Sequence, residues 1–335
     1  MTPPAAPPPE AIMQQMIVGF WVSRAIHAAA KYQFPDLLKA GPKTSDEIAV
    51  ASGTHAPSVY RLLRALASAG LVVEHDGRRF SSTPVFATLE SDRPGTMRYF
   101  ALAELGQEHY SAWEEFPHSV ATGEMAFTHR FKQQIWEYYA ANSEHAGVFN
   151  NSMTALTQWA IAAVLAAYDF KPYRKIIDVG GGHGALLEAA LGASPEGCGV
   201  LFDAPAVIAD VKPNPRYAAI AGDFFKAVPA DGDLYMMKWI IHDWNDDQSV
   251  RILSNISKVM APGAKVILVE AVLEPPPGNP LKNFMDLNMM VMTGGCERTE
   301  AEYKSLYDRA GLTVTRFVPT GSPFSIVEGE AKKEQ

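Results

Sequence analysis

A histidine with acidic neighbours follows one of the apolar segments of this sequence. His242 and Asp243 come after Leu234–Lys238, which has the composition of a buried strand. Glu270 ends the next apolar segment, and the ends of neighbouring parallel strands lie side by side. Histidine has an ordinary pKa of about 6.5, so it takes up and releases protons near neutral pH. The pattern therefore indicates a site that transfers a proton.

A second acidic residue follows a pair of glycines. Glu297 comes after Gly294 and Gly295, which allow the backbone to approach another segment closely. A carboxylate bound to one imidazole nitrogen fixes the tautomer and stabilises the imidazolium, and both Glu270 and Glu297 are candidates for this role. The simpler alternatives are a surface acid at Glu270 and a helix-start residue at Glu297, because Thr299–Glu302 has the pattern of a helix beginning.

A glycine-rich turn follows the first apolar strand of the C-terminal half. Asp178–Gly184 has the sequence DVGGGHG and precedes a helix expected at about 185–191. Glycines let the backbone turn sharply and approach a ligand, but the spacing also fits the dinucleotide fingerprint, so the turn alone does not identify the ligand. His183 is the other candidate base among the nine histidines. We expect its loop to face a cofactor instead.

Polar residues after the next three strands favour a nucleoside. Asp203 ends the second strand, where a carboxylate accepts both hydroxyls of a ribose, although a helix N-cap is the alternative. Asp223 and Phe224 follow the third strand and could bind and stack an adenine. Lys238 adds a cation at the end of the fourth strand. This set is not expected in a nicotinamide dehydrogenase.

These residues require a sheet whose strands end at a common edge. From residue 173 onward, apolar strands alternate with helical stretches, which predicts an α/β fold with a Rossmann-like, doubly wound and mainly parallel sheet. The predicted strands are Lys175–Val179, Gly199–Phe202, Ala218–Ala221, Leu234–Lys238, Val266–Glu270 and Thr313–Phe317.

The segment 328–335 is interpreted as a charged low-complexity tail.

The pattern of the N-terminal residues predicts a mainly helical domain of the winged-helix type. Helical periodicity over 11–33 is followed by a helix capped at Thr44 or Ser45 and by a second helix that ends before Gly70. Residues 71–81 form a predicted hairpin with an Asp-Gly turn. Residues 1–95 hold nine Lys and Arg against eight Asp and Glu, and a nearly neutral module favours dimerisation over DNA binding.

Composition excludes several classes of protein. The 335 residues are 47% apolar and 20% charged, as in ordinary globular chains. The net charge of −8 argues against polyanionic partners such as nucleic acid or an anionic membrane. Two cysteines cannot build a disulfide framework or a cysteine zinc cluster. No signal-peptide or membrane-span pattern is present, so we expect a cytoplasmic protein.

Five ordered motifs resemble one enzyme family over nearly the whole chain. They are DVGGGHG at 178–184, FDAP at 202–205, GDFF at 222–225, KWIIHDW at 238–244 and GGCERT at 294–299. They are similar to the S-adenosylmethionine-dependent O-methyltransferases of the plant caffeate, acetylserotonin and bacterial polyketide-tailoring type. The resemblance implies a homodimer built by the winged helix, methylation of a hydroxyl on a small aromatic or polyketide-like molecule, S-adenosylhomocysteine as product, and no metal.

The resemblance also implies roles for residues of the cofactor site. Gly180 would line the cofactor loop, and Asp203 would bind the ribose. Asp223 and Phe224 would flank the adenine, and Lys238 would contact the cofactor from the fourth strand. The predicted domains are a winged-helix dimerisation domain at 1–95, a helical linker and pocket roof at 96–170, and the cofactor-binding catalytic domain at 171–335.

The reacting groups follow from the same resemblance. Methyl transfer needs one base that removes the acceptor's proton, and His242 fits this role, flanked by Glu270 and Glu297. Two alternatives stay open. An enzyme of this fold that performs hydroxylation or a pericyclic step should lack the histidine or its carboxylates. A winged-helix regulator with a ligand-sensing domain should bind DNA at low salt.

The acceptor pocket should be apolar. Phe149 and Met153 match a segment that lines the acceptor site in the resembling enzymes. Met289 and Met292 offer flexible thioethers that suit a flat aromatic ring, although core packing is the alternative for any single methionine. Asp243 is the predicted polar contact. Cys296 replaces a common lysine of the plant enzymes, and the methionine-rich segment is one residue shorter, so the acceptor itself is left open.

Overall fold

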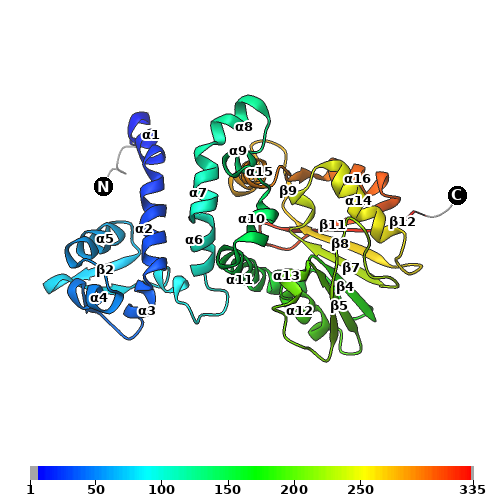
Figure 1. Ribbon diagram of the computed structural model, residues 1–335, viewed down its shortest axis with the longest axis horizontal. Helices are drawn as coiled ribbons and strands as arrows, with labels where there is room; N and C mark the ends of the chain where they lie inside the picture. Colours follow the sequence, from blue (N-terminus) through cyan, green and yellow to red (C-terminus); the bar gives the residue numbers. More distant parts are fainter. Residues whose placement is uncertain (1–6, 333–335) are drawn as a thin grey trace, which may run out of the picture. The chain divides into compact units, whose positions relative to one another are not determined.

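The chain divides into two compact units. The computed structural model describes residues 7–332 (Figure 1). The division lies between Tyr110 and Ser111, later in the chain than the boundary predicted at residue 95. The second predicted boundary, at residue 170, lies inside the second unit. Each unit has its own apolar core.

The first unit has the winged-helix order of elements. Thr44 caps α4 by accepting a hydrogen bond from the backbone N–H of Glu47, whose carboxylate accepts from the backbone N–H of Thr44. Gly77, with φ of +73°, makes the tight turn of the β2–β3 hairpin. The elements are α1 Pro9–Ile17, α2 Gly19–Lys31, α3 Phe34–Leu38, β1 Lys43–Thr44, α4 Ser45–Ser52, α5 Ala56–Ser68, β2 Val72–His75, η1 Asp76–Arg78, β3 Arg79–Ser82, η2 Phe86–Leu89 and α6 Arg98–Glu104.

The helix expected over 11–33 is two helices. The first ends at Ile17, and the second begins at Gly19. Glycine has the weakest helix propensity after proline, which explains a break at this point. The side chains of Ala29 and Ala30 at the end of α2 are fully buried in the core of the unit, together with Phe80 of the hairpin.

The second unit contains a seven-stranded sheet. Its strand order is β11-β12-β8-β7-β4-β5-β6, parallel from β8 to β6, with β12 antiparallel to both of its neighbours. All six predicted strands are present, with ends that differ by at most two residues, and the Rossmann-like fold is confirmed. The strands are β4 Lys175–Val179, β5 Cys198–Asp203, β6 Tyr217–Ala221, β7 Leu234–Lys238, β8 Lys265–Glu270, β9 Val272–Leu273, β10 Arg298–Thr299, β11 Leu312–Pro319 and β12 Ser325–Ala331.

Helices cover both faces of this sheet (Figure 1). Along β4, Ile177 packs in one cluster with Ile252 of α14, and Ile176 packs in another with Leu187 of α12 and Val164 of α11. This alternation is expected of a strand buried on both faces. The helices of this part of the chain, whether or not they contact the sheet, are α7 Gln107–Glu114, which crosses the division between the units, α8 Phe116–Thr122, α9 Ala126–Phe131, α10 Ile135–Ala141, α11 Ser143–Ala167, α12 Ala185–Ala193, α13 Pro205–Ile208, η3 Ile241–Asp243, α14 Asp246–Ser257, α15 Pro280–Met292 and α16 Glu300–Arg309.

The interpretation of 328–335 as a charged tail is wrong for its described residues 328–332. Residues up to Ala331 belong to β12, which lies inside the sheet between β11 and β8. The charges are neutralised across the strands: Glu328 accepts hydrogen bonds from Arg316, and Glu330 pairs with Lys265. A charged strand can lie inside a sheet when its partners are close, and these partners lie on the two neighbouring strands.

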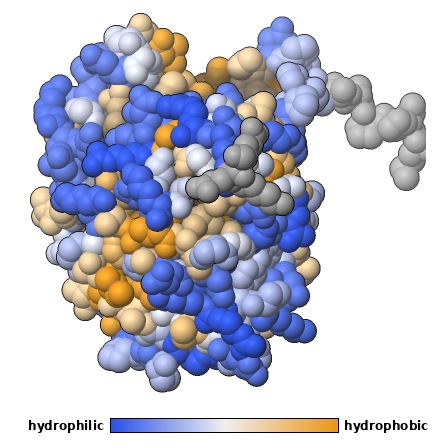
Figure 2. Space-filling model, turned by 90° about the vertical axis from the view of Figure 1, so that its right-hand side faces the viewer, coloured by the Kyte–Doolittle hydropathy of each residue, from blue (hydrophilic) through white to orange (hydrophobic). Residues whose placement is uncertain are grey.

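The face of the second unit in Figure 2 is mainly hydrophilic, with separate apolar patches. Within residues 7–332, no helix combines the length and the apolar character that a membrane crossing requires.

The place of Gly329 in β12 can be tested by substitution. A side chain added there would clash with the ring of Tyr307 and lie 2.8 Å from the carbonyl oxygen of Thr313. We therefore expect Gly329→Ala to lower the free energy of unfolding by about 1–3 kcal/mol in urea denaturation, as overpacking does. Gly192→Ala is the control, because the exposed helix position has open space around it. Equal stability of the two variants would contradict the buried position of β12.

Candidate active site

The predicted cofactor residues lie at the carboxyl ends of four adjacent strands. Gly180 follows β4, Asp203 ends β5, Asp223 follows β6 and Lys238 ends β7. The strand order β7-β4-β5-β6 places these ends next to one another. The structure therefore brings together the residues that the sequence assigned to a nucleoside site.

The glycine-rich turn approaches its neighbours more closely than any side chain would allow. A Cβ at Gly181 would lie 2.6 Å from the carboxyl group of Asp178, and Gly180 has a φ of +72°. The backbone N–H of Gly182 donates a hydrogen bond of 2.8 Å to Asp203 Oδ2. The turn is thus fixed to the end of β5, and the glycines are required by its geometry.

Two buried polar atoms beside this turn have no hydrogen-bond partner among the described residues. They are Oδ2 of Asp178 and Nε2 of His183, whose Nδ1 lies 3.1 Å from Thr154 Oγ1. Burial raises the pKa of Asp178 to about 7, against the effect of the nearby Lys238. Asp178 was not predicted as a site residue. A carboxylate in an apolar strand was the available signal.

Asp203 is fixed by backbone donors. Its Oδ1 accepts from the N–H of Ala204 at 2.6 Å, in addition to the bond from Gly182. Burial raises its pKa, although these two hydrogen bonds act in the opposite direction. Helix α13 has Ala204 as its N-cap residue, so the alternative that Asp203 caps a helix is wrong.

Asp223 and Phe224 lie at the outer part of the sheet edge. Asp223 is exposed, and its Oδ2 is 3.3 Å from Nζ of Lys226. The ring of Phe224 contacts Trp244 edge-on, with centroids 5.9 Å apart. Asp223 also borders a hollow of about 330 Å³, lined by Phe202, Ile220, Ala221, Gly222, Lys226, Ala227, Val228 and Pro229.

Lys238 is surrounded by acidic groups and an aromatic ring. Its Nζ lies 3.3 Å from the ring centroid of Trp239. Burial lowers the pKa of Lys238 to about 7, against the nearby charges of Glu270 and Asp178. Trp239 has a φ of +56°, an uncommon conformation for a bulky residue that bends the chain sharply after β7.

The bend at Trp239 starts a short turn held by Glu270. Oε1 of Glu270 accepts hydrogen bonds from the backbone N–H groups of Ile240 and Ile241, at 3.2 and 3.0 Å. Its Oε2 lies 3.9 Å from Nδ1 of His242 and has no hydrogen-bond partner among the described residues. Glu270 is fully buried, so the surface-acid alternative is wrong.

His242 is buried among three carboxylates. Its Nδ1 is 2.8 Å from Oε1 of Glu297, and its Nε2 is 3.8 Å from Oδ1 of Asp243. Burial alone would lower the pKa of the imidazole, but the negative charges of Glu297, Glu270 and Asp243 raise it to about 10. The three carboxylates therefore favour the protonated imidazole, in the direction opposite to the effect of burial.

A small parallel sheet fixes the two glutamate segments relative to each other. Strand β9 follows Glu270 by two residues, and β10 begins directly after Glu297. The two strands pair in the register Val272–Arg298. In addition, the N–H of Glu297 donates to Asp286 Oδ1 at 2.9 Å. Both carboxylates thus reach His242 from segments that are hydrogen-bonded together.

The glycine before Glu297 lies directly against the histidine turn. A Cβ at Gly295 would clash with the carbonyl oxygen of His242 and lie 2.7 Å from the backbone nitrogen of Trp244. This confirms the close approach expected of the glycine pair. The helix-start residue is Thr299, which caps α16 by accepting from the N–H of Glu302. Glu297 is therefore not part of the helix beginning.

Two predicted acceptor residues share an aromatic cluster. Phe149 packs on the ring of Tyr139, with centroids 4.9 Å apart, and Met292 is buried in the same cluster. The ring of Trp136, in this cluster, has its centroid 6.2 Å from that of Trp244, which stands two residues after His242. The remaining predicted acceptor residues are Met153, one helical turn after Phe149, Met289, which is buried on α15, and Asp243 beside the imidazole.

Two groups of three potential metal ligands occur among residues 7–332, each with donor atoms within 4.8 Å of one another. The sequence showed no such cluster, because the donors of the buried group come from three separate segments. The absence of a metal stays a prediction. The groups are His242, Glu270 and Glu297, and His118, Glu124 and His129.

Known proteins match both units. An O-methyltransferase domain matches residues 113–313, and an O-methyltransferase dimerisation domain matches residues 14–92. The chain belongs to the O-methyltransferase family. It is an S-adenosylmethionine-dependent O-methyltransferase, and the resemblance of its motifs to that family is confirmed.

Relatives of this O-methyltransferase span its whole length. It is 39% identical to the phenazine O-methyltransferase PhzM of Lysobacter antibioticus over 330 residues, 96% of each chain. The crystal structure of LaPhzM matches with a TM-score of 0.93 and 38% identity over 97% of this chain and 100% of that one. The structure of CalO1, a methyltransferase of calicheamicin biosynthesis with bound S-adenosylhomocysteine, matches with a TM-score of 0.84 and 31% sequence identity. The match covers 96% of this chain and 98% of that one.

The pKa of His242 tests the geometry of its carboxylates. Glu297 is the strongest of the charges that raise this pKa, so we expect Glu297→Gln to lower it from about 10. An NMR titration of the imidazole resonances measures the shift. Glu300→Gln is the control, since Glu300 is exposed and pairs with Lys304 on the surface of α16. An unchanged pKa in Glu297→Gln would contradict the hydrogen bond to Nδ1.

Proposed function

We propose that this O-methyltransferase methylates a hydroxyl, most simply a phenol, of a small aromatic or polyketide-like metabolite, with His242 as general base. The observation that carries the proposal is the burial of His242 among Glu297, Glu270 and Asp243 beside the nucleoside end of the sheet. The phenazine and calicheamicin relatives support an acceptor from secondary metabolism.

The glycine turn fits S-adenosylmethionine. The unpartnered oxygen of Asp178 and the unpartnered Nε2 of His183 are hydrogen-bonding groups left for a ligand. Asp203 offers a carboxylate for a ribose, and the absence of a side chain at Gly180 lets Ile240 pack directly against the turn. In our proposal Asp223 and Phe224 flank the adenine, and Lys238 contacts the cofactor. The bound cofactor supplies an activated methyl group on a cationic sulfur.

His242 would receive the acceptor's proton on Nε2. Its Nδ1 is directed to Glu297, which orients the ring and stabilises the imidazolium. Glu270 holds the turn through two backbone N–H groups, so its contribution is mainly to place the ring. The acceptor's hydroxyl would then lie between Nε2 and the methyl group, and correct alignment is worth on the order of 7–11 kcal/mol.

The raised pKa of His242 suits a phenol. A phenolic hydroxyl titrates near pH 10, close to the value of about 10 for the imidazole. Proton transfer between groups of matched pKa has no large energetic penalty. The base must first lose its own proton, so turnover should rise with pH. We infer that the carboxylates set the strength of the base as well as its orientation.

The aromatic cluster would hold the acceptor. Phe149 and Met292 offer apolar contacts, and Trp136 connects their cluster to the histidine turn through Trp244. Met153, Met289 and Asp243 complete the proposed acceptor side. Flat rings and thioethers contact an aromatic acceptor without demanding one fixed shape.

The first unit supports a homodimer. Exposed apolar side chains follow one another along α1 and α2, including Met16 at 71% and Trp21 at 62% exposure. Patches of this kind mark association surfaces, and the matched dimerisation domain covers α2 and the end of α1. The proposed partners are a second copy of the chain and the small hydroxyl acceptor.

Replacing the base tests the proposal. We expect His242→Gln to lose about 10²–10⁴-fold in turnover, the usual contribution of a general base, while S-adenosylhomocysteine binding in calorimetry is retained. His55→Gln is the control, because His55 hydrogen-bonds only at the surface of the first unit. Full turnover of His242→Gln on a phenol panel would refute the assigned base. If the wild type and the variant both fail to methylate any phenol of the panel, phenol methylation is refuted.

Metal removal tests whether the buried group of possible ligands, His242, Glu270 and Glu297, needs an ion for turnover. Nδ1 of His242 is engaged with Glu297, which leaves the imidazole in position without an ion. We therefore expect turnover to be unchanged after extensive dialysis against a chelator, measured with S-adenosylmethionine and a phenol. Loss of turnover that added zinc or magnesium restores would contradict a metal-free mechanism.

A further inference from the structure

Arg298 is the largest fully buried side chain among the described residues. Only 1% of it is exposed, and it stands directly after Glu297. An arginine has five N–H donors in a rigid, planar arrangement. A buried guanidinium is costly unless these donors are paired. The proposed mechanism gives this residue no role.

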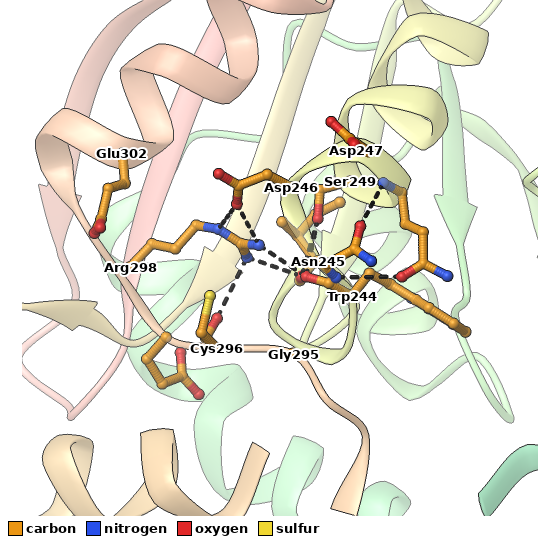
Figure 3. A network of polar contacts seen from close by, with 12 residues as sticks. Trp244, Asn245, Asp246, Asp247, Ser249, Gly295, Cys296, Arg298 and Glu302 are labelled. Atoms are coloured by element: carbon orange, nitrogen blue, oxygen red, sulfur yellow. Dashed lines mark hydrogen bonds and ion pairs between the residues drawn. The ribbon is translucent and has the colours of Figure 1, made fainter. Parts of the chain in front are cut away.

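All five donors of Arg298 have acceptors (Figure 3). Nε and Nη2 donate to Asp246 Oδ1 at 3.0 and 2.9 Å, and Nη2 also donates to the carbonyl of Trp244 at 2.7 Å. Nη1 donates to the carbonyls of Ile241 and Cys296 at 3.1 and 3.3 Å. Two of these carbonyls belong to residues that flank the His242–Asp243 pair on either side.

We propose that Arg298 is a positioning residue that holds the His242 turn in its reactive geometry. The proposal rests on the proposed function, since it concerns the placement of the same base. Arg298 donates hydrogen bonds to the turn at the carbonyls of Ile241 and Trp244, and its ion pair with Asp246 links the turn to the first residue of α14. A shift of this turn would move the imidazole relative to Glu297.

The neighbours of Arg298 fix the same turn from other directions. Gly295 lies against the backbone of His242, and Glu297 binds the imidazole. The hydroxyl of Ser249 donates to the carbonyls of Ile241 and Trp244, at 3.3 Å each. One short segment, 295–298, therefore contacts the backbone, the side chain and the carbonyl oxygens of the turn.

Lysine cannot replace arginine in this arrangement. Its ammonium group has three donors on a single nitrogen, whereas the acceptors of Arg298 surround a planar group with three nitrogens. We expect Arg298→Lys to lose about 10²-fold in kcat, the scale reported for a misplacement of 1 Å. Binding of S-adenosylhomocysteine, measured by calorimetry, should persist because Arg298 contacts none of the proposed cofactor residues.

Asp246→Ala tests the same contacts from the exposed partner of the ion pair. The carboxylate of Asp246 is 57% exposed, so its loss leaves no buried cavity, yet it removes the charge that fixes the guanidinium. Asp247→Ala is the matched control. Asp247 lies in the same first turn of α14 and pairs with Arg309, but its side chain is 91% exposed. Both variants remove one acidic residue from the helix beginning.

The pH dependence of kcat separates positioning from stability. The charges facing His242 are Glu297, Glu270 and Asp243, and neither Asp246 nor Asp247 is among them. A looser contact with Glu297 should move the rising limb of the profile to lower pH in Asp246→Ala and Arg298→Lys, with lower kcat and little change in KM. Asp247→Ala should match the wild type.

The outcomes are distinct. If Asp246→Ala and Arg298→Lys both keep the wild-type kcat and pH profile, the positioning role is overturned. If they only lower the melting temperature, Arg298 is a structural residue and the proposal fails. If the wild type and Asp247→Ala themselves show no methyl transfer to any phenol, the proposed function fails, independently of Arg298.

Discussion

The burial of one imidazole among three carboxylates is the constraint on which the rest of this structure depends. Each charge would be costly alone in the interior. The carboxylates face an imidazole of opposite charge, Glu297 is hydrogen-bonded to it, and Glu270 accepts from two backbone N–H groups. The groups come from the turn after β7, the end of β8 and the segment before β10. The order of the parallel strands and the β9–β10 pair are therefore required to keep them together.

Glu297 and Glu270, two of the carboxylates beside His242, make different contacts. Glu297 binds Nδ1 directly, whereas Glu270 uses one oxygen for two backbone N–H groups and leaves the other near the ring. The first contact orients the imidazole and raises its pKa, and the second fixes the path of the backbone. The sequence predicted that both lie near the histidine, but it held no information on this division.

Several features of the site follow from local rules, and others do not. Predictions for Gly180, Asp203 and the glycine pair depended on strand order and on the steric freedom of glycine, and these are properties of short segments. The pKa of His242 could not be predicted, because it is the sum of burial and of charges from separate segments. Asp178 had one sequence signal, a carboxylate in an apolar strand, but its burial and its unpartnered oxygen are visible only in three dimensions.

The sequence by itself determined the family, the alternation of strands and helices, and the residue types at the sheet edge, since each depends on motifs or on periodicity within a few residues. Only the tertiary structure decided that the charged segment of β12 lies inside the sheet, and that Arg298 grips the histidine turn. In both cases a charged side chain lies inside the fold because residues of other elements pair with it. Such compensation is a property of the packed molecule and leaves no local pattern.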